Sequence, residues 1–221
     1  MDNPRKISDN AKNVANDLLK LGSIQLNVTQ PFTWVSGIKS PIYCDNRLVN
    51  SDVAIRKNMV GYFVELIQDK FKDVEIIAGV ATGGIPLGVL IADRLNLPFI
   101  YARQAPKEHG LKKQIEGSYQ EGNKVVLIED HISTGGSSLI AVQALRDGKL
   151  DVIGLISIMS YGFSSATEKF EKNDVNHYTL CDLDTVLDIS LERGNITENE
   201  KASILSFKNS PSEWGNSLVT G

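Results

Sequence analysis

The sequence predicts an α/β fold with a doubly wound, mostly parallel central sheet flanked by helices. From residue 75 onward, short apolar runs typical of buried strands alternate with segments whose apolar residues recur at helical spacing. Strands that alternate with helices pair in parallel, because each helix carries the chain back across the sheet. The 221 residues, 42% of them hydrophobic, are enough for one domain with its own core.

The elements are expected in the following order. A first helix over residues 8–21 places Val14, Ala15 and Leu18 on one face, and a second runs from Ser51, a favourable N-cap, to about Lys70. Strands follow over 75–80, 98–103, 124–130, 152–160 and 177–181, and helices over 84–95, 136–147 and 165–171, with helical segments after Asp182.

Residues 22–50 fall outside this alternation. They are rich in Thr, Ser, Gly and Pro and show no helical period, so we expect a small N-terminal hood subdomain there. The hood, a core over about 51–190 and a C-terminal tail over 191–221 would together form a single domain spanning 1–221.

Composition and charge exclude several function classes. The net charge of −4 and the pI near 5.4 argue against general nucleic-acid binding, which favours a basic face. Cys44 and Cys181 stand far apart without a CxxC pattern, which fits free thiols in a reducing compartment. The sequence contains no 18-residue apolar run and no signal-peptide pattern, so we expect no membrane partner and a cytoplasmic location.

The most specific signal is an apolar strand that ends in two carboxylates. Residues 125–128 are apolar, Glu129 and Asp130 follow, and a loop of small and hydroxyl-bearing residues then opens a helix at Gly136. Open α/β sheets bind ligands at this end of a strand, and backbone N–H groups at a helix start bind phosphate. The carboxylates beside such a loop can hold sugar hydroxyls. No GxxxxGK[ST] or strand-linked GxGxxG pattern occurs, which argues against nucleotide loops of those two kinds.

A second loop of the same type lies at residues 79–85 and contains Thr82 and Gly83. It also follows an apolar strand and opens a helix. Two anion loops at neighbouring strand ends suit a substrate that carries phosphate groups at both ends.

Two further segments carry cations and aromatic side chains. The polar stretch 104–120 is longer than an ordinary strand–helix connection, and with Arg103, Lys107 and His109 it is typical of an active-site lid. Such cations stabilise negative charge that develops on a leaving group. In the hood, Tyr43 could stack on a planar base, while Lys39 or Arg47 could face a base carboxylate or hold the hood in place.

Together these segments resemble the orotate phosphoribosyltransferases, within the type I phosphoribosyltransferase family. The stretch from Glu129 to Ser137 resembles the family's motif for phosphoribosyl diphosphate (PRPP), and residues 32–47 and 103–110 resemble its hood and lid. The resemblance implies Mg²⁺-dependent transfer of the phosphoribosyl group of PRPP to N1 of orotate. The products would be orotidine 5-monophosphate and diphosphate, on the route to UMP. It also implies a homodimer in which each lid closes over the partner's site.

The resemblance assigns roles residue by residue. Lys107, Asp130 and His109 would be catalytic, and Ser133, Tyr43, Lys39 and Arg47 would bind orotate. The Mg²⁺ would be held mainly by PRPP and water, without a direct protein ligand. PRPP would be bound by Arg103, Lys107, His109, Glu129, Asp130, His131, Ile132, Ser133, Thr134, Gly135, Gly136, Ser137, Thr82 and Gly83.

Three departures from some relatives affect the base and the lid. Gln104 and Val35 replace lysines, and the stretch from Tyr161 to Phe163 lacks an arginine that those relatives use. The orotate carboxylate must therefore be held differently, through Arg47 or the hood backbone. Two alternatives stay open at this point: a purine phosphoribosyltransferase, and a non-catalytic regulator that senses PRPP.

Overall fold

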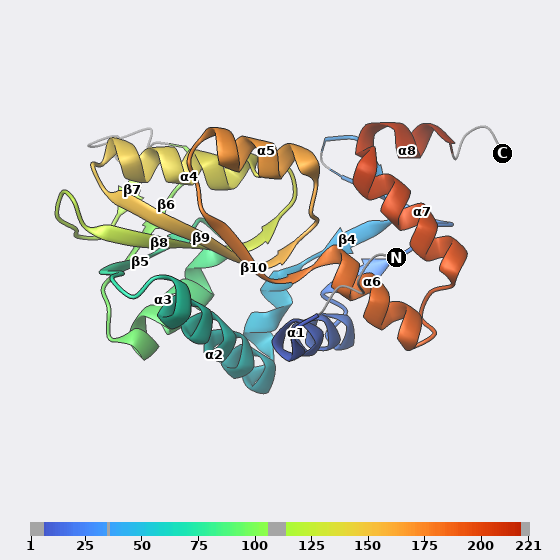
Figure 1. Ribbon diagram of the computed structural model, residues 1–221, viewed down its shortest axis with the longest axis horizontal. Helices are drawn as coiled ribbons and strands as arrows, with labels where there is room; N and C mark the ends of the chain where they lie inside the picture. Colours follow the sequence, from blue (N-terminus) through green and yellow to red (C-terminus); the bar gives the residue numbers. More distant parts are fainter. Residues whose placement is uncertain (1–6, 35, 106–113, 218–221) are drawn as a thin grey trace, which may run out of the picture.

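A six-stranded sheet forms the centre of the computed structural model, which describes residues 7–34, 36–105 and 114–217 (Figure 1). Across the sheet the strands run β10 (His177–Asp182), β9 (Asp151–Ser160), β8 (Lys124–Ile132), β5 (Ile76–Val80), β6 (Phe99–Ala102) and β7 (Ile115–Glu116). The first five are parallel, and β7 alone pairs antiparallel, with β6. The predicted α/β fold with a mostly parallel sheet is confirmed.

Helices cover both faces of this sheet (Figure 1). One face carries α4 (Gly136–Asp147) and α5 (Ser164–Lys172), and the other carries α2 (Val53–Lys70) and α3 (Gly84–Leu95), with α1 (Asp9–Lys20) and α6 (Leu183–Glu192) beside them. Residues of β8 alternate between the two layers: Val125 and Leu127 pack in one core cluster, and Val126 and Ile128 in the other. A continuous apolar strand is therefore needed here, because both of its faces are buried.

The hood consists of two small antiparallel sheets. Strand β1 (Ile24–Leu26) pairs with β4 (Ile42–Cys44), and β2 (Phe32–Thr33) pairs with β3 (Lys39–Ser40). A 3₁₀ helix, η1 (Asn46–Ser51), leads from the hood into α2. Toward the other end of the chain, α7 (Glu198–Asn209) leads to α8 (Pro211–Ser217), and α8 packs against β3 of the hood (Figure 1).

The expected elements of the core agree with the observed ones within one or two residues, and two details differ. Ser51 was expected as the N-cap of the second helix, which is wrong: it ends η1, and the Asp52 carboxylate caps α2 by accepting the Ile55 amide proton at 2.9 Å. Strand β7, within the polar stretch, was not expected, because its two residues are too short to show a pattern.

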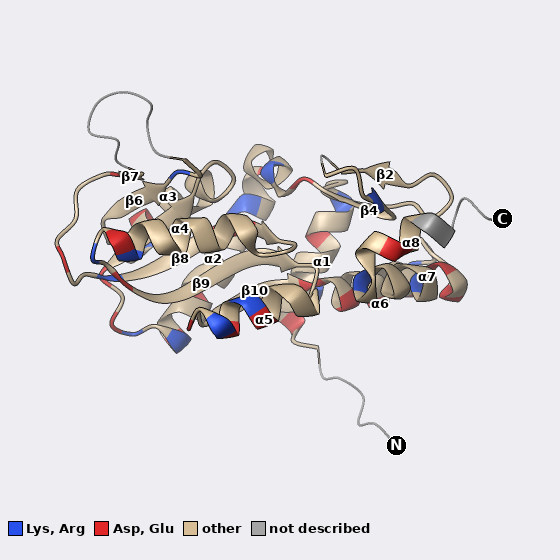
Figure 2. Cartoon of the chain, turned by 90° about the horizontal axis from the view of Figure 1, so that it is seen from above, with Lys and Arg blue, Asp and Glu red and all other residues tan. Residues whose placement is uncertain are grey.

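The described surface mixes charges of both signs. Both Lys and Glu residues occur along α5 and α7, and Figure 2 shows blue and red segments of the ribbon interspersed over these helices. Such a mixture differs from the single-sign surface that general nucleic-acid binding favours. Within the described ranges, none of the helices has both the length and the apolar character that crossing a membrane requires.

Candidate active site

The two loops that were expected to bind anions lie side by side at the carboxyl ends of β5 and β8. These strands are neighbours in the sheet. A Cβ atom added to Gly83 would collide with the carboxylate of Asp130, so glycine is required for this close approach. The loop after β5 and the carboxylates of β8 thus form one continuous edge, as expected for a ligand site of an open α/β sheet.

The loop from Ser133 to Gly136 ends in a helix start that is suited to an anion. Gly135 has a left-handed backbone (φ 74°), and a Cβ there would lie 2.9 Å from Phe170 Cζ. Because Gly135 has no side chain, the chain can turn sharply here, and the first N–H groups of α4 lie at the carboxyl end of β8. The dipole of α4 also favours negative charge at this position. Lys169, which lies on α5, stabilises this loop because its Nζ donates to the Thr134 carbonyl at 3.0 Å.

The two adjacent carboxylates occupy different environments. Glu129 is 4% exposed, and its Oε2 accepts a hydrogen bond from Ser138 Oγ at 3.1 Å. Burial, reinforced by the charge of Asp130, raises the pKa of Glu129 well above its usual value. Burial also raises the pKa of Asp130, but the hydrogen bond and charge of His131 outweigh it and leave that pKa below its usual value. Asp130 is therefore the ionised member of the pair.

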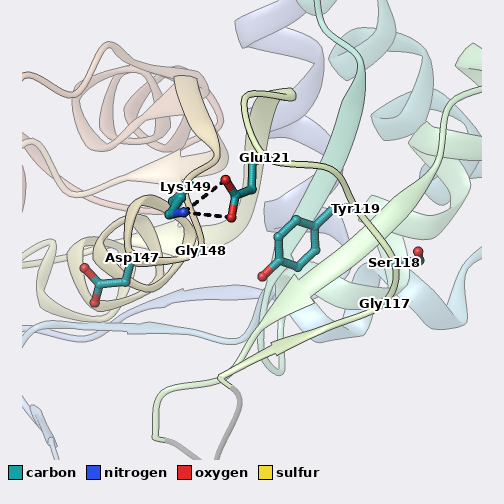
Figure 3. A pocket seen from close by; sticks show the side chains of 7 residues that line it. All are labelled: Gly117, Ser118, Tyr119, Glu121, Asp147, Gly148 and Lys149. Carbon is teal, nitrogen blue, oxygen red and sulfur yellow. Dashed lines mark hydrogen bonds and ion pairs between the residues drawn. The ribbon is translucent and has the colours of Figure 1, made fainter.

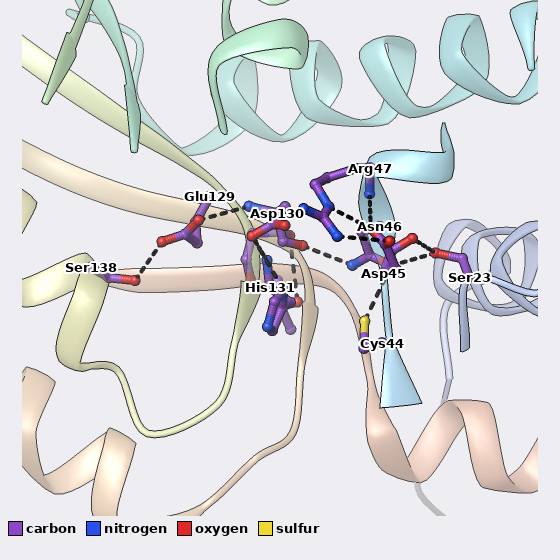
Figure 4. A network of polar contacts seen from close by, with 11 residues as sticks. Ser23, Cys44, Asp45, Asn46, Arg47, Glu129, Asp130, His131 and Ser138 are labelled. Atoms are coloured by element: carbon purple, nitrogen blue, oxygen red, sulfur yellow. Dashed lines mark hydrogen bonds and ion pairs between the residues drawn. The ribbon is translucent and has the colours of Figure 1, made fainter. Parts of the chain in front are cut away.

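A buried amide connects the hood to this carboxylate strand. Asn46 is 1% exposed, and its Nδ2 donates to the Asp130 carbonyl at 2.9 Å (Figure 4). Its Oδ1 accepts from Ser23 Oγ at 2.8 Å and from Cys44 Sγ at 3.3 Å. The hood is thus fixed to the strand end through one hydrogen bond that spans 84 residues of sequence.

A hollow of about 230 Å³ opens between the hood and the strand ends. Its walls are mostly aromatic, and a planar ring fits such walls by stacking. Trp34 is held edge-on by Tyr161 and by Phe207, with ring centroids at 5.5 and 5.7 Å. The residues that line the hollow are Thr33, Trp34, Tyr43, Cys44, His131, Ser133 and Tyr161.

The four residues that the sequence assigned to the orotate base do not lie together in the structure. Tyr43 and Ser133 line the hollow. Lys39 does not line it, but its Nζ donates to Thr33 Oγ1 at 2.7 Å at the edge. Arg47 points elsewhere: its guanidinium forms a two-fold contact with Asp45, at 2.7 and 2.8 Å (Figure 4).

Of the stretch expected to form the lid, the structure describes only the residues at its two ends. Arg103 follows β6, and its Nη1 lies 3.7 Å from Glu116 Oε1. Gln104 Nε2 donates to the Ser137 carbonyl at 3.4 Å, so the stretch expected to form the lid begins beside the loop that follows β8. Lys107 and His109 lie outside the described residues.

A larger hollow, of about 500 Å³, lies at the opposite ends of the strands (Figure 3). It is flanked by Tyr119 and by an ion pair in which Lys149 Nζ lies 2.9 Å from Glu121 Oε1. Both partners are about two-thirds exposed, so this contact contributes little to stability. Because ligands of open α/β sheets bind at the carboxyl ends, the smaller aromatic hollow is the stronger candidate despite its size.

Sequence reasoning gave no role to several residues that build this site. Asn46 and Trp34 lie in the hood segment that was singled out, and Tyr161 follows β9. The sequence feature that could have identified Asn46 is its position between Asp45 and Arg47. That hood segment was interpreted only for its charged and aromatic residues. No local signal marks Phe207, which reaches the site from the tail.

Comparisons with known proteins agree with this geometry. Residues 52–187 match the family model of the phosphoribosyl transferase domain. The chain is 47% identical, over 200 residues, to an orotate phosphoribosyltransferase of Bacteroides thetaiotaomicron, covering 90% of this chain and 94% of that one. It belongs to the orotate phosphoribosyltransferase family. The resemblance drawn from the motifs is therefore confirmed.

Solved structures place the fold in the same family. An orotate phosphoribosyltransferase from Aeropyrum pernix superimposes with a TM-score of 0.73 at 27% identity, covering 83% of this chain and 99% of that one. Leishmania donovani UMP synthase superimposes with a TM-score of 0.76 at 25% identity. That match covers 90% of this chain but 42% of the UMP synthase chain.

Proposed function

We propose that this chain catalyses the reaction for which its family is named, in pyrimidine biosynthesis. N1 of orotate attacks C1 of the PRPP ribose, the bond from C1 to diphosphate breaks, and orotidine 5-monophosphate and diphosphate are formed. The observation that carries the proposal is the position of the aromatic hollow beside Asp130 and the phosphate loop. A base in the hollow would face a ribose held at the strand edge.

The site supplies positioning and electrostatics. Ionised Asp130 would accept hydrogen bonds from ribose hydroxyls, and the start of α4 would hold the 5-phosphate. The loop at Thr82 and Gly83 would approach the diphosphate, joined by Arg103, Lys107 and His109 from the lid. Positive charge that closes over the leaving diphosphate lowers the barrier, because it acts most strongly on the transition state.

The donor set near Asp130 fits a Mg²⁺ ion that arrives with its substrate. In the described part of the chain, no cluster of three or more His, Cys, Asp or Glu side chains is arranged to hold a metal. Mg²⁺ retains several waters and favours phosphate oxygens, so PRPP itself would supply its ligands. When bound, the ion would neutralise charge on the diphosphate. The free thiol of Cys44 is consistent with the proposed cytoplasmic location.

The proposed homodimer is supported by exposed apolar side chains on adjacent elements. Val89 and Leu90 on α3 are 44% and 37% exposed, Val53 on α2 is 54% exposed, and Leu48 on η1 is 39% exposed. These elements pack against one another, so a second copy of the chain could cover the exposed side chains together.

The choice of base that the protein accepts as a substrate tests the proposed reaction directly. Purified protein with PRPP and Mg²⁺ should consume orotate and require both, whereas adenine, hypoxanthine and uracil should react much more slowly. Comparable use of a purine with no use of orotate would replace the proposal with a purine phosphoribosyltransferase. Tight PRPP binding without turnover of any base would indicate a regulator.

Subunit complementation tests the lid in trans. Lys107→Ala and Asp130→Asn should each be nearly inactive, and mixed dimers should contain one intact site and one doubly altered site. Random reassociation makes about half of the dimers mixed, so roughly a quarter of wild-type activity should return, by the arithmetic of a symmetric dimer. Failure to recover activity, with exchange of subunits shown by mass spectrometry, would mean that the lid serves its own chain.

A further inference from the structure

The aromatic hollow lacks an obvious partner for the negative charge of its substrate. Orotate carries a carboxylate, yet none of the seven lining residues is a lysine or an arginine. Among those seven, His131 is the one whose side chain can become a cation. An anion buried against aromatic walls without a charged or hydrogen-bonding partner would be costly.

His131 is oriented with one nitrogen toward Asp130, and its ring lines the hollow. Its Nδ1 lies 3.2 Å from Asp130 Oδ1 and is shielded from solvent. The side chain is nevertheless 33% exposed and lines the hollow. The ring also lies 6.2 Å from that of Tyr161, centroid to centroid. A ligand in the hollow would therefore contact this ring, and Nε2 is the nitrogen that is not turned toward Asp130.

The other residues that line the hollow offer no competing positive charge, and the nearest described cation, Lys39, lies at its edge, where its Nζ donates to Thr33 Oγ1 at 2.7 Å. Burial raises the pKa of the Cys44 thiol and of the Tyr161 hydroxyl, so both are neutral. Tyr43 also lines the hollow and has no cationic form. Arg47, which the sequence offered for this role, is already bound to Asp45 through two contacts.

We propose that His131 recognises the carboxylate of the pyrimidine base, and this role rests on the proposed function. In its cationic form the imidazole would donate from Nε2 to the carboxylate, while Nδ1 stays turned toward Asp130 Oδ1, 3.2 Å away, because both nitrogens of an imidazolium are donors. Charge-assisted hydrogen bonds of this kind are stronger than neutral ones. The ring would thus lie between a carboxylate of the protein and one of the substrate, and it replaces the missing arginine after β9.

The contact with Asp130 complicates a simple activity assay. Removing His131 also disturbs Asp130, which is expected to hold the ribose, so the loss of turnover alone would not identify the role. A pair of ligands that differ only in the carboxylate removes this problem. Orotidine 5-monophosphate and uridine 5-monophosphate share their ribose and phosphate, so the ratio of their dissociation constants reports the carboxylate contact.

The experiment measures both constants by calorimetry for the wild type and for His131→Leu. The wild type should bind orotidine 5-monophosphate at least about tenfold more tightly, the effect of one charge-assisted hydrogen bond. His131→Leu should lose most of this preference, and His131→Arg should retain it because it restores a cation. His177→Leu makes the same chemical change on β10, outside the hollow, and should leave the ratio unchanged.

The outcomes separate the two proposals. If the wild type prefers orotidine 5-monophosphate and His131→Leu keeps that preference, the role of His131 is wrong and the proposed function stands. If the wild type shows no preference, both are wrong. Should His131→Leu fail to fold, as judged by its melting curve, His131→Gln provides the same comparison: it keeps the size and one donor, and should retain only part of the preference.

Discussion

The half of the site proposed to bind phosphate and the half proposed to bind the base are built in different ways. The phosphate half comes from two short continuous segments, the ends of β5 and β8 with the loops that follow them. The base half is assembled from the hood, the end of β8, the residues after β9 and, behind Trp34, the tail. Local geometry fixes the first half, whereas the second depends on packing between distant parts of the chain.

The two halves therefore differ in which residues would contact the substrate and which residues hold those side chains in place. Residues of the phosphate half are positioned largely by backbone geometry, such as that of the glycines at positions 83 and 135. Residues of the base half are held by side chains that themselves need support. Changes in the phosphate half should therefore affect turnover more than folding, and changes behind the base half should affect folding and base affinity together.

The largest expected effect is that of Asp130→Asn. The substitution keeps the shape but removes the ionised carboxylate, so turnover should fall at least about tenfold, or about 1.4 kcal/mol of barrier. Asp130 has no partner in the apolar core, so the melting temperature should shift little. A variant that melts much earlier but keeps its turnover per folded molecule would show that Asp130 has a structural role. Steady-state kinetics and thermal melting together decide between these results.

The same difference explains which parts the sequence could predict. The carboxylates and both anion loops were recognised because strand, loop and helix start follow one another without interruption. Arg47 was assigned to the base or to the hood on its charge alone, and the structure shows it engaged with Asp45, two residues away. Phe207 and Asn46 gained their roles from contacts across 173 and 84 residues, which no local pattern encodes.

Asn46→Ala tests the connection between the two halves. It would leave buried hydrogen-bonding groups without partners, so the free energy of unfolding should fall by about 1–3 kcal/mol. Turnover should fall as well, because the hood would no longer be fixed to the Asp130 backbone. Asn50→Ala is the matched control, since Asn50 lies in the same 3₁₀ helix and its Oδ1 has no hydrogen-bond partner. Equal losses in the two variants, measured by urea unfolding, would contradict a special role for Asn46.

Phe207→Leu tests the support that the tail gives to the base. The substitution removes three carbon atoms from a fully buried side chain, so it should cost about 1–3 kcal/mol of stability. Loss of the edge-on contact with Trp34 should raise KM for orotate several-fold and leave KM for PRPP nearly unchanged. Phe63→Leu alters an equally buried phenylalanine of α2 and should reduce stability without this selectivity. A rise in both KM values for Phe207→Leu would mean that the tail supports the whole fold and not the base pocket.

Glu129→Gln should have the smallest effect, although Glu129 is adjacent to Asp130. Burial raises the pKa of Glu129 well above its unfolded value, so ionising this side chain in the folded protein costs stability as the pH rises above about 4.5. Glutamine resembles the protonated form and can keep contacts with Ser138 and with the Asp130 amide. At pH 7–8 the variant should therefore melt at or above the wild-type temperature, and the difference should shrink toward pH 5, where the wild type carries the proton itself. Turnover should stay within a few-fold of wild type, in contrast to Asp130→Asn. If Glu129→Gln lost as much activity as Asp130→Asn, both carboxylates would have to be ionised during the reaction, and the substrate would then have to reverse the effect of burial on Glu129.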